Sequence, residues 1–312
     1  MRYDPDADKV DEDQALMERI IAAVEATESY ESFVLTETYS IAGSATIIPL
    51  TYMQTETSYV HRVSHVIRGN SPNVQSFFTI RSQQHEFEEE MITNIVQGEI
   101  RFVDNTYYLT AEAIKGNELS AEVSDGWVMF TADSSQEVLR DLLMPSVEEL
   151  DSDELWGALI DNSVTIDTSN LDAVGNLIDF RISQDVLEDG TPVDVITMSF
   201  DFDRIIQRSS VSSSPEDEPT EADIERELLR NIQFEVSFFI DEQGRLVGRH
   251  DYIKTFANSA DLAQNSDEED DQTAYPEIEI RVEVQENKTT FYTNINEALT
   301  PVEAPADAVP AE

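Results

Sequence analysis

The side chains best suited to metal binding or acid–base catalysis in this sequence are its four histidines, His61, His65, His85 and His250. His61 and His65 have the i, i+4 spacing with which two histidines on a helix bind zinc. The residues around them, however, alternate between apolar and polar types, which predicts a strand. On a strand the two histidines are ~13 Å apart along one face, too far to bind one ion. We therefore expect these histidines to be structural.

Other sequence patterns that would indicate catalysis are missing. The chain has no G-x-S-x-G motif, no glycine-rich phosphate loop and no cysteine. Carboxylates are so numerous that no pair stands out as a general acid and base. Asp4, Asp6 and Asp8 resemble the start of a calcium loop, but Lys9 and Ala15 stand where that loop needs glycine and a bidentate glutamate. We expect a non-enzymatic protein with no cofactor and no bound metal.

The charge of the chain excludes two classes of surface ligand. Sixty-five acidic and 19 basic residues give a formal net charge of −46. Such a field repels nucleic acid and anionic lipid headgroups, so we expect neither to bind the surface. No apolar run approaches the ~20 residues that cross a bilayer. Residues 1–12 are acidic, are expected to be disordered, and lack the apolar core of a signal peptide; a cytoplasmic protein could begin this way, and so could an exported one whose leader has been removed.

The clearest structural element is the segment from Asn231 to Phe256. Apolar residues alternate with polar ones from Ile232 to Ile240, a turn sequence follows at Asp241 to Gly244, and a second strand returns. Similar strand patterns recur along most of the chain, separated by turn residues such as Gly43-Ser44 and Asp104-Asn105. We count about ten strands and expect one strongly curved antiparallel sheet.

Helical patterns occur in two places. Residues 13–29 carry one apolar stripe, which predicts a helix packed on the sheet. Residues 134–160 contain two segments of helical spacing, expected to lie over the sheet as a lid. The expected fold class is therefore α+β, a half-barrel covered by helices. The expected domain spans 13–300, with a flexible insert at 209–220, an acidic loop at 259–274 and a flexible tail at 301–312.

Large aromatic side chains on these elements are the candidates for a binding site. Ordinary core packing accounts for most of them. The alternative is that they line an apolar cavity, because a curved sheet closed by helices leaves a gap that side chains need not fill. Such a cavity would bind apolar ligands by burial. The candidate lining residues are Tyr108, Trp127, Phe130, Trp156, Phe234 and Phe238.

Several short motifs, in this order, resemble the LolA-like superfamily of bacterial lipoproteins, most closely the mycobacterial LppX/LprG group. The N-terminal helix runs into SYESFVLTETYSI, and FVDNTYYLTAE follows with Tyr108 at the family's aromatic position. GWVMF with Trp127 comes next, VSFFIDEQGRLVGRHDYI resembles the family's hairpin, and PVEAPADA resembles its closing tail. The likeness spans roughly residues 14–306.

The resemblance implies a single domain with a lipid-holding cavity between a curved antiparallel sheet and helices. It also implies an exported cell-surface or periplasmic protein, anchored in relatives through a lipidated cysteine that this chain does not contain. We accordingly expect a monomeric carrier of a lipid or another hydrophobic molecule. An envelope interaction or sensor module with a filled core is the alternative, and a hydrolase is a third hypothesis, because the fold does not settle the function.

Overall fold

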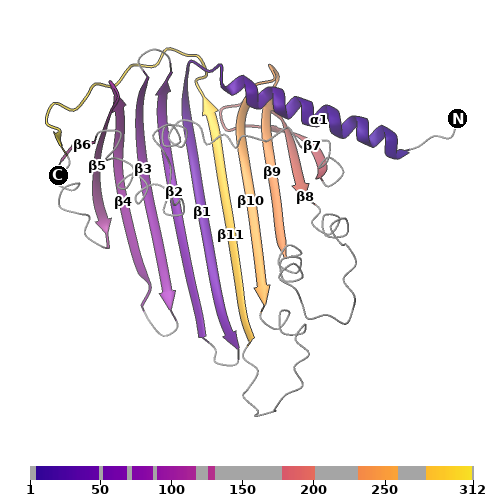
Figure 1. Ribbon diagram of the computed structural model, residues 1–312, viewed down its shortest axis with the longest axis horizontal. Helices are drawn as coiled ribbons and strands as arrows, with labels where there is room; N and C mark the ends of the chain where they lie inside the picture. Colours follow the sequence, from indigo (N-terminus) through magenta and orange to yellow (C-terminus); the bar gives the residue numbers. More distant parts are fainter. Residues whose placement is uncertain are drawn as a thin grey trace, which may run out of the picture.

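The structure is a computed structural model that describes residues 5–48, 52–68, 72–86, 90–116, 126–130, 178–200, 231–258 and 279–310. These ranges contain one helix, α1 (Pro5–Thr27), and twelve strands in a single sheet (Figure 1). The strands of the N-terminal part are β1 (Ser32–Ile48), β2 (Tyr52–Ile67), β3 (Asn73–Glu86), β4 (Ile92–Val103), β5 (Thr106–Lys115) and β6 (Val128–Phe130). The others are β7 (Ile178–Val186), β8 (Pro192–Phe200), β9 (Ile232–Asp241), β10 (Leu246–Asn258), β11 (Glu279–Thr293) and β12 (Val309–Pro310).

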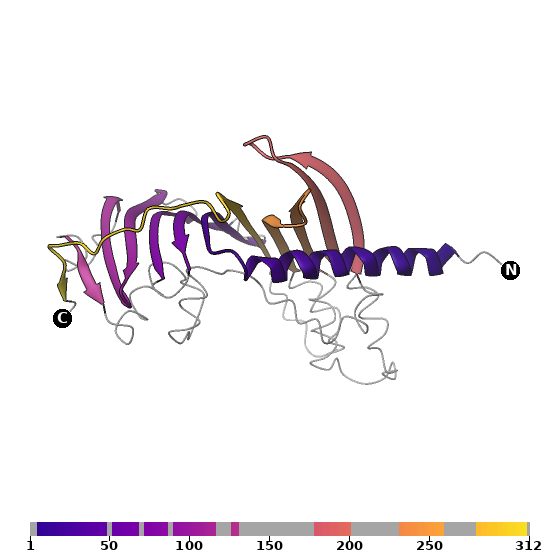
Figure 2. The ribbon, with the colours of Figure 1, turned by 90° about the horizontal axis from the view of Figure 1, so that it is seen from above.

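The strand order across the sheet is β12-β6-β5-β4-β3-β2-β1-β11-β10-β9-β8-β7. All neighbours are antiparallel except β12 and β6, which are parallel, so the sheet is mixed. The centre is formed by β1, which pairs with β2 on one side and with β11, from near the C-terminus, on the other. Seen from above, the sheet is twisted and bent, and α1 lies along one side of it (Figure 2).

The expected α+β class is wrong: outside α1, nearly all of the described chain belongs to one twelve-stranded sheet, so the estimate of about ten strands and several helices is also wrong. One cause of this error is that the strands are longer than expected. The turn predicted at Gly43-Ser44 does not form, because β1 runs through both residues and pairs there with β2 and β11. Gly43 does not take a positive φ. The predicted helices at 134–160 lie outside the described residues, as do the segments 209–220 and 259–274.

Two tight turns and the N-terminal helix are confirmed. β9 and β10 form the predicted hairpin, and Gly244 in its turn has a φ of 77°. The Asp241 carboxylate stabilises this turn by accepting hydrogen bonds from the backbone N–H groups of Gln243 and Arg245, both at 2.9 Å. Between β4 and β5, Asp104 and Asn105 take left-handed φ values of 50° and 64°, as a two-residue hairpin turn requires.

The two ends of the described chain are more regular than the sequence suggests. The helix already begins at Pro5, within the stretch expected to be disordered. The segment after Pro301, expected to be flexible, is tied to the sheet. The Asn73 side chain donates to the Val302 carbonyl at 2.9 Å and accepts from its N–H at 3.0 Å. Farther on, Val309 donates its N–H to the Trp127 carbonyl at 2.9 Å and begins β12.

One face of the sheet carries the core, and we call the face that bears Phe33 and Leu35 the inner face. The buried hydrophobic side chains of the protein form one main cluster. The register of the strands places every strand residue of this cluster on the inner face. α1 packs against the same face and buries Met17, Ile20 and Ala23. Among these cluster residues, the fully buried sheet side chains include Leu35, Val66, Val74, Ile100, Leu109, Val128, Ile196, Phe238 and Ile240.

The core is densely packed where α1 leads into β1. We call this region, around Tyr30, Phe33, Leu35 and Tyr292, the packed half of the inner face. The rings of Tyr30, Phe33 and Tyr292 meet edge to face, with centroid separations of 6.3, 5.9 and 5.5 Å. The Tyr30 hydroxyl donates to the Leu246 carbonyl at 2.9 Å, which joins the end of α1 to β10. Such contacts add to the burial of the rings and fix the helix on the sheet.

The opposite, outer face is mixed, with many polar side chains but also an exposed Phe77 and the edge-to-face pair Phe239 and Phe291. In β1 and β11 the outward positions carry Thr36, Thr38 and Thr289, and the neighbouring strands place His61, His65 and His250 on the same side. α1, the only helix within the described ranges, does not combine the length and the apolar character that a membrane span requires.

Candidate functional site

The structure divides the predicted lining residues between the two faces. Phe130, Phe234 and Phe238 lie on the inner face, and Phe238 is buried. Tyr108 lies on the outer face, where it pairs with Arg101. Trp127 also contacts this outer-face arginine, whose guanidinium carbon is 4.5 Å from the ring centroid.

These residues therefore do not surround one space. Trp156, the sixth candidate, lies outside the described residues. That the inner-face aromatics line a ligand cavity stays a prediction.

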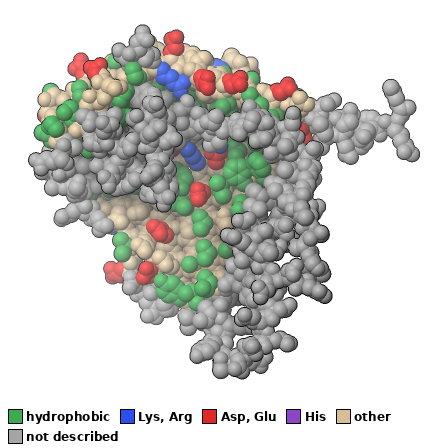
Figure 3. All heavy atoms as spheres, in the orientation of Figure 1, with side chains coloured by type: hydrophobic (Ala, Val, Ile, Leu, Met, Phe, Trp, Pro, Cys, Tyr) green, Lys and Arg blue, Asp and Glu red, His purple; other side chains and the backbone are tan. Residues whose placement is uncertain are grey.

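A group of charged side chains lies in the middle of the inner face, and sequence reasoning missed it. Glu37 of β1 is directly opposite Arg62 of β2, while Lys288 of β11 is opposite Asp251 of β10. Arg249 of β10 lies two residues from Asp251 on the same face. We call Glu37, Arg62, Arg249, Asp251 and Lys288 the charge cluster. Figure 3 shows Lys or Arg and Asp or Glu side chains between hydrophobic ones on this side of the molecule.

Each arginine of the charge cluster forms an ion pair. Arg62 donates to Glu37 at 2.6 Å, and the two side chains are only 6% and 12% exposed. Arg249 donates to Asp251 at 2.7 Å, with exposures of 11% and 16%. Removing such charges from water is costly and is offset only by close pairing.

The ion pairs have an aromatic border. Arg62 is opposite Phe78 on β3, and the Arg249 guanidinium lies 5.6 Å from the centroid of the Phe238 ring. Both phenylalanines belong to the buried core. The charges are therefore enclosed on two sides by apolar groups, which strengthens electrostatic interactions between them.

Lys288 is the unpaired member of the cluster. It lies between Tyr39 and Asp251 in the register, but no ion pair or hydrogen bond of its ammonium group is formed within the described parts of the chain. Burial lowers the pKa of Lys288, the charges of Glu37 and Asp251 raise it, and those of Arg62 and Arg249 lower it. Burial has the largest effect, so the pKa of Lys288 is lower than that of a lysine in water.

One more polar pair lies beside the cluster, on the side away from α1. The Tyr39 hydroxyl donates to the Glu286 carboxylate at 3.4 Å. Burial and the neighbouring Glu286 charge both raise the pKa of Tyr39. Tyr39 therefore stays neutral at physiological pH and presents a hydroxyl next to Lys288.

Beyond this pair the inner face becomes apolar again, and we call its side chains the distal strip: Ile41, Phe234, Ile253, Ile280, Val282 and Val284. Unlike the packed half, this region is accessible, with Ile280 and Val282 exposed by 42% and 37%. The members of the strip on β11 run from Val284 to Ile280, four residues, which at ~3.3 Å per residue is about 13 Å. The strip is thus long enough for part of an extended acyl chain.

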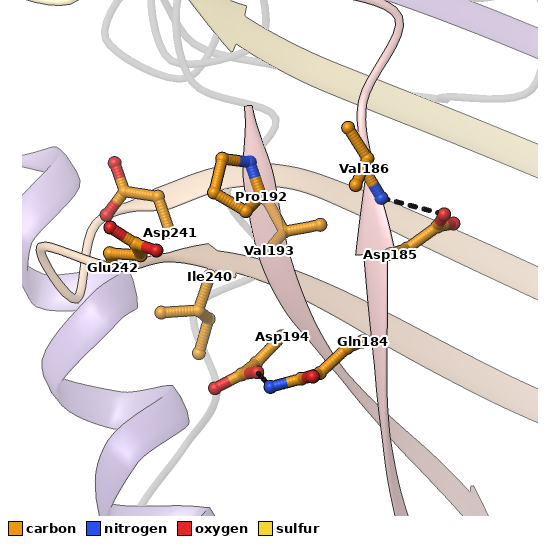
Figure 4. A pocket seen from close by; sticks show the side chains of 9 residues that line it. All are labelled: Gln184, Asp185, Val186, Pro192, Val193, Asp194, Ile240, Asp241 and Glu242. Atoms are coloured by element: carbon orange, nitrogen blue, oxygen red, sulfur yellow. Dashed lines mark hydrogen bonds between the residues drawn. The ribbon is translucent and has the colours of Figure 1, made fainter. Parts of the chain in front are cut away.

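A separate pocket lies at the ends of β7, β8 and β9, with a volume of about 500 Å³ (Figure 4). Its Asp194 carboxylate accepts a hydrogen bond from Gln184 at 3.4 Å and forms an ion pair with Arg19 of α1 at 2.5 Å. The hydrogen bond from Arg19 is the main reason that the pKa of Asp194 is lowered. The lining residues are Gln184, Asp185, Val186, Pro192, Val193, Asp194, Ile240, Asp241 and Glu242.

This pocket offers acidic groups among its described lining residues. Asp241 is already used by the β9–β10 turn, where it also accepts from the Arg245 guanidinium at 2.8 Å. Within the described ranges, no three side chains of His, Asp or Glu are arranged to hold a metal ion. His61 and His65 lie on the outer face of β2, on a strand as predicted.

Comparison with known proteins gives little further information. No family model matches the chain, and no curated protein matches it. A solved structure described as a beta-barrel-like protein of the domain of unknown function DUF1849, from Brucella abortus, is similar over 78% of this chain and 94% of that one, at 9% identity and a TM-score of 0.15. A TM-score this low carries no conclusion about fold or function.

Proposed function

We propose that this protein binds the apolar chain of a lipid or a similar hydrophobic molecule along the inner face of its sheet, without catalysing a reaction on it. One observation carries the proposal. The distal strip resumes the apolar pattern of the core beyond the charge cluster and Glu286, on the same face, yet its side chains at Val282 and Ile280 are exposed.

The energetics favour an extended apolar ligand. Burying apolar surface stabilises a complex by about 25 cal/mol per Å², so a long chain lying on the strip gains several kcal/mol before the costs of association. Strand side chains on one face form a row, which suits a chain that runs parallel to β11. A compact polar substrate would find few partners on this strip.

The side chains at the strip allow a matched pair of variants. Val282→Asp places a charge on the strip, whereas Gln285→Asp places the same charge on the outer face of the same strand. We expect Val282→Asp to weaken binding of dodecanol more than about tenfold, because a carboxylate must be desolvated against the chain. Gln285→Asp should leave the affinity within about twofold.

Native mass spectrometry of the wild-type protein from its host, followed by calorimetric titration with dodecanol, is the test. A co-purifying lipid or a saturable alcohol complex that is lost in Val282→Asp supports the proposal. Protein that is free of ligand and does not bind dodecanol contradicts it. Equal weakening by both variants would also contradict it, because the effect would then come from total charge and not from the strip.

A further inference from the structure

We infer that a second copy of this chain adds its own β7 to the free edge of β7, so that two molecules share one continuous sheet across a two-fold axis. The inference does not depend on the proposed function, and it replaces the expected monomer with a dimer. It rests on the last strand of the sheet, which within the described residues has a neighbouring strand on one side only.

The two edges of the sheet differ in how well they are protected. At one end, β12 contains two residues, one of them Pro310, and it pairs with the short strand β6. Short strands and proline are means by which proteins protect an edge against pairing with another chain. At the other end, β7 has nine residues with no proline or lysine among them, and Ile182 and Val186 are 52% and 61% exposed. This second edge lacks both protections.

The β7–β8 hairpin shows which backbone groups of β7 point away from the sheet. Leu187 donates its N–H to the Thr191 carbonyl at 2.9 Å, toward β8. Successive residues of an antiparallel strand direct their backbone groups alternately to the two sides. The register therefore directs toward the free edge the N–H and C=O groups of Phe180, Ile182, Gln184 and Val186. The Val186 N–H donates to the adjacent Asp185 carboxylate at 2.8 Å (Figure 4).

A second β7 fits this edge in an antiparallel register centred on Ser183. Residues of the outer face then lie beside residues of the outer face in the combined sheet. Arg181 of each copy lies opposite Asp185 of the other, and opposite charges in such cross-strand pairs are stabilising. The Arg181 side chain is 68% exposed although it contacts Glu235, and Asp185 is also exposed, so a partner can reach both.

Other registers of the same two strands are less favourable. Centring the pair on Ile182 places Asp179 of one copy opposite Asp185 of the other, and like charges in that position destabilise pairing. Centring it on Phe180 joins Asp179 to Arg181, but this register overlaps fewer residues of β7. Charge and overlap together favour the register described above. The resulting interface is isologous, as in most dimers.

The position of α1 agrees with this arrangement. The helix packs on the inner face, and Figures 1 and 2 show that its N-terminal end projects beyond β7. A second β7 continues the sheet below this projecting part. On the same face it brings the exposed Val186 of one copy opposite Phe180 of the other. Pairing therefore covers apolar surface that one copy alone leaves in solvent.

The net charge of the chain gives the interface a characteristic salt dependence. A charge of −46 on each copy opposes association through long-range repulsion. Salt screens this repulsion, with a Debye length of about 3 Å at 1 M, whereas backbone hydrogen bonds and apolar contacts persist. The dimer should therefore form more readily as the salt concentration rises.

Analytical ultracentrifugation of the full chain, at about 1 to 100 µM and in about 0.15 M and 2 M KCl, is the test. We expect a species of twice the mass of one chain that increases with protein and salt concentration. Ile182→Pro removes an N–H at the free edge, where a strand tolerates proline, and should raise the Kd of the dimer more than about tenfold. Ile182→Thr keeps this N–H and the β-branched shape, and should raise the Kd by less than about threefold.

A charge swap tests the register at the lower salt concentration. Arg181→Asp brings like charges together in both cross-strand pairs and should raise the Kd about fivefold or more. Combining Arg181→Asp with Asp185→Arg restores opposite charges and should recover most of the affinity. The control Arg81→Asp makes the same change of charge at an exposed position on the outer face of β3, and should leave the Kd within about twofold.

The outcomes decide the inference in two steps. Wild-type protein that stays monomeric at every protein and salt concentration overturns it, and this measurement needs no variant. A dimer that persists unchanged in Ile182→Pro also overturns it, because the interface would then lie elsewhere. Recovery in the double charge variant supports the register. Equal weakening by Arg181→Asp and Arg81→Asp contradicts the register, because total charge would then be the cause.

Discussion

The packed half of the inner face and the distal strip are built from the same strands with the same alternation, yet only one of them is buried. Phe33 and Leu35 near one end of β1 are inaccessible, whereas Val282 and Ile280, farther along on the paired strand β11, are exposed. The charge cluster lies between the two regions. The comparison shows that alternation places side chains on a face, while burial depends on what packs against that face, here α1 and the ring of Tyr30.

The largest expected difference between the regions is in stability. Phe33 is fully buried, and its ring contacts Tyr30 and Tyr292. Phe33→Ala should lower the free energy of unfolding by about 4 kcal/mol, the range found for buried phenylalanines. Val282→Ala on the distal strip should lower it by less than about 1 kcal/mol. Urea unfolding followed by circular dichroism measures both, and similar losses for the two variants would remove the distinction.

The boundary between the regions can be tested through its buried ion pair. Arg62→Leu leaves the Glu37 carboxylate without its arginine in an apolar setting, which should cost about 3 kcal/mol. The double variant Arg62→Leu with Glu37→Leu should be clearly more stable than Arg62→Leu alone, because the Glu37 carboxylate is then no longer buried without Arg62. Thermal unfolding of the three proteins gives the comparison; a double variant less stable than the single one would contradict this account of the pair.

The buried core of the inner face should also respond to alkaline pH. Burial is the main cause that raises the pKa of Tyr30 and of Tyr107, each to about 12. An unfolded tyrosine ionises near pH 10, so between about pH 10 and 12 the unfolded state loses protons that the folded state retains, and stability falls as pH rises. The loss for one tyrosine is about 3 kcal/mol, since each pKa unit corresponds to about 1.4 kcal/mol.

Tyr30→Phe is the control for this alkaline effect. It loses the hydrogen bond to the Leu246 carbonyl, which should cost about 1 kcal/mol at neutral pH. It should also make the fall in stability between pH 10 and 12 shallower. An unchanged slope in the variant would show that Tyr30 does not titrate in this way.

The smallest expected effect concerns Lys288. Because burial lowers its pKa, the charged ammonium group is less stable in the folded protein than in water. Lys288→Met should therefore leave the stability unchanged or raise it by less than about 1 kcal/mol at pH 7. A clear loss of stability in thermal unfolding would contradict this account and assign Lys288 a structural role.

Sequence patterns predicted the local features well. The alternation from Ile232 to Ile240 correctly gave the inward residues of β9, and Gly244 and Asp104-Asn105 correctly marked turns. Gly43-Ser44 failed as a turn because pairing with strands on both sides outweighed the local preference for a bend. Which strands pair, and so which fold class results, depends on contacts distant in sequence, as between β1 and β11.

The charge cluster could have been suspected from the same alternation. Glu37 continues the inward series of Phe33 and Leu35 on β1. Arg62 is likewise an inward residue of β2. A charged residue in an apolar series is therefore the signal that was available. That five such residues come together could not be predicted, because it depends on the register of four different strands.

The central claim, that a ligand lies on the distal strip, has one direct measurement. The chain has no cysteine, so Val282→Cys and Gln285→Cys can each be labelled at a single site with an environment-sensitive fluorophore and titrated with dodecanoate. We predict a saturable change of emission at position 282 on the inner face and none at position 285 on the outer face. No saturable change at either position, or the same change at both, would contradict the account.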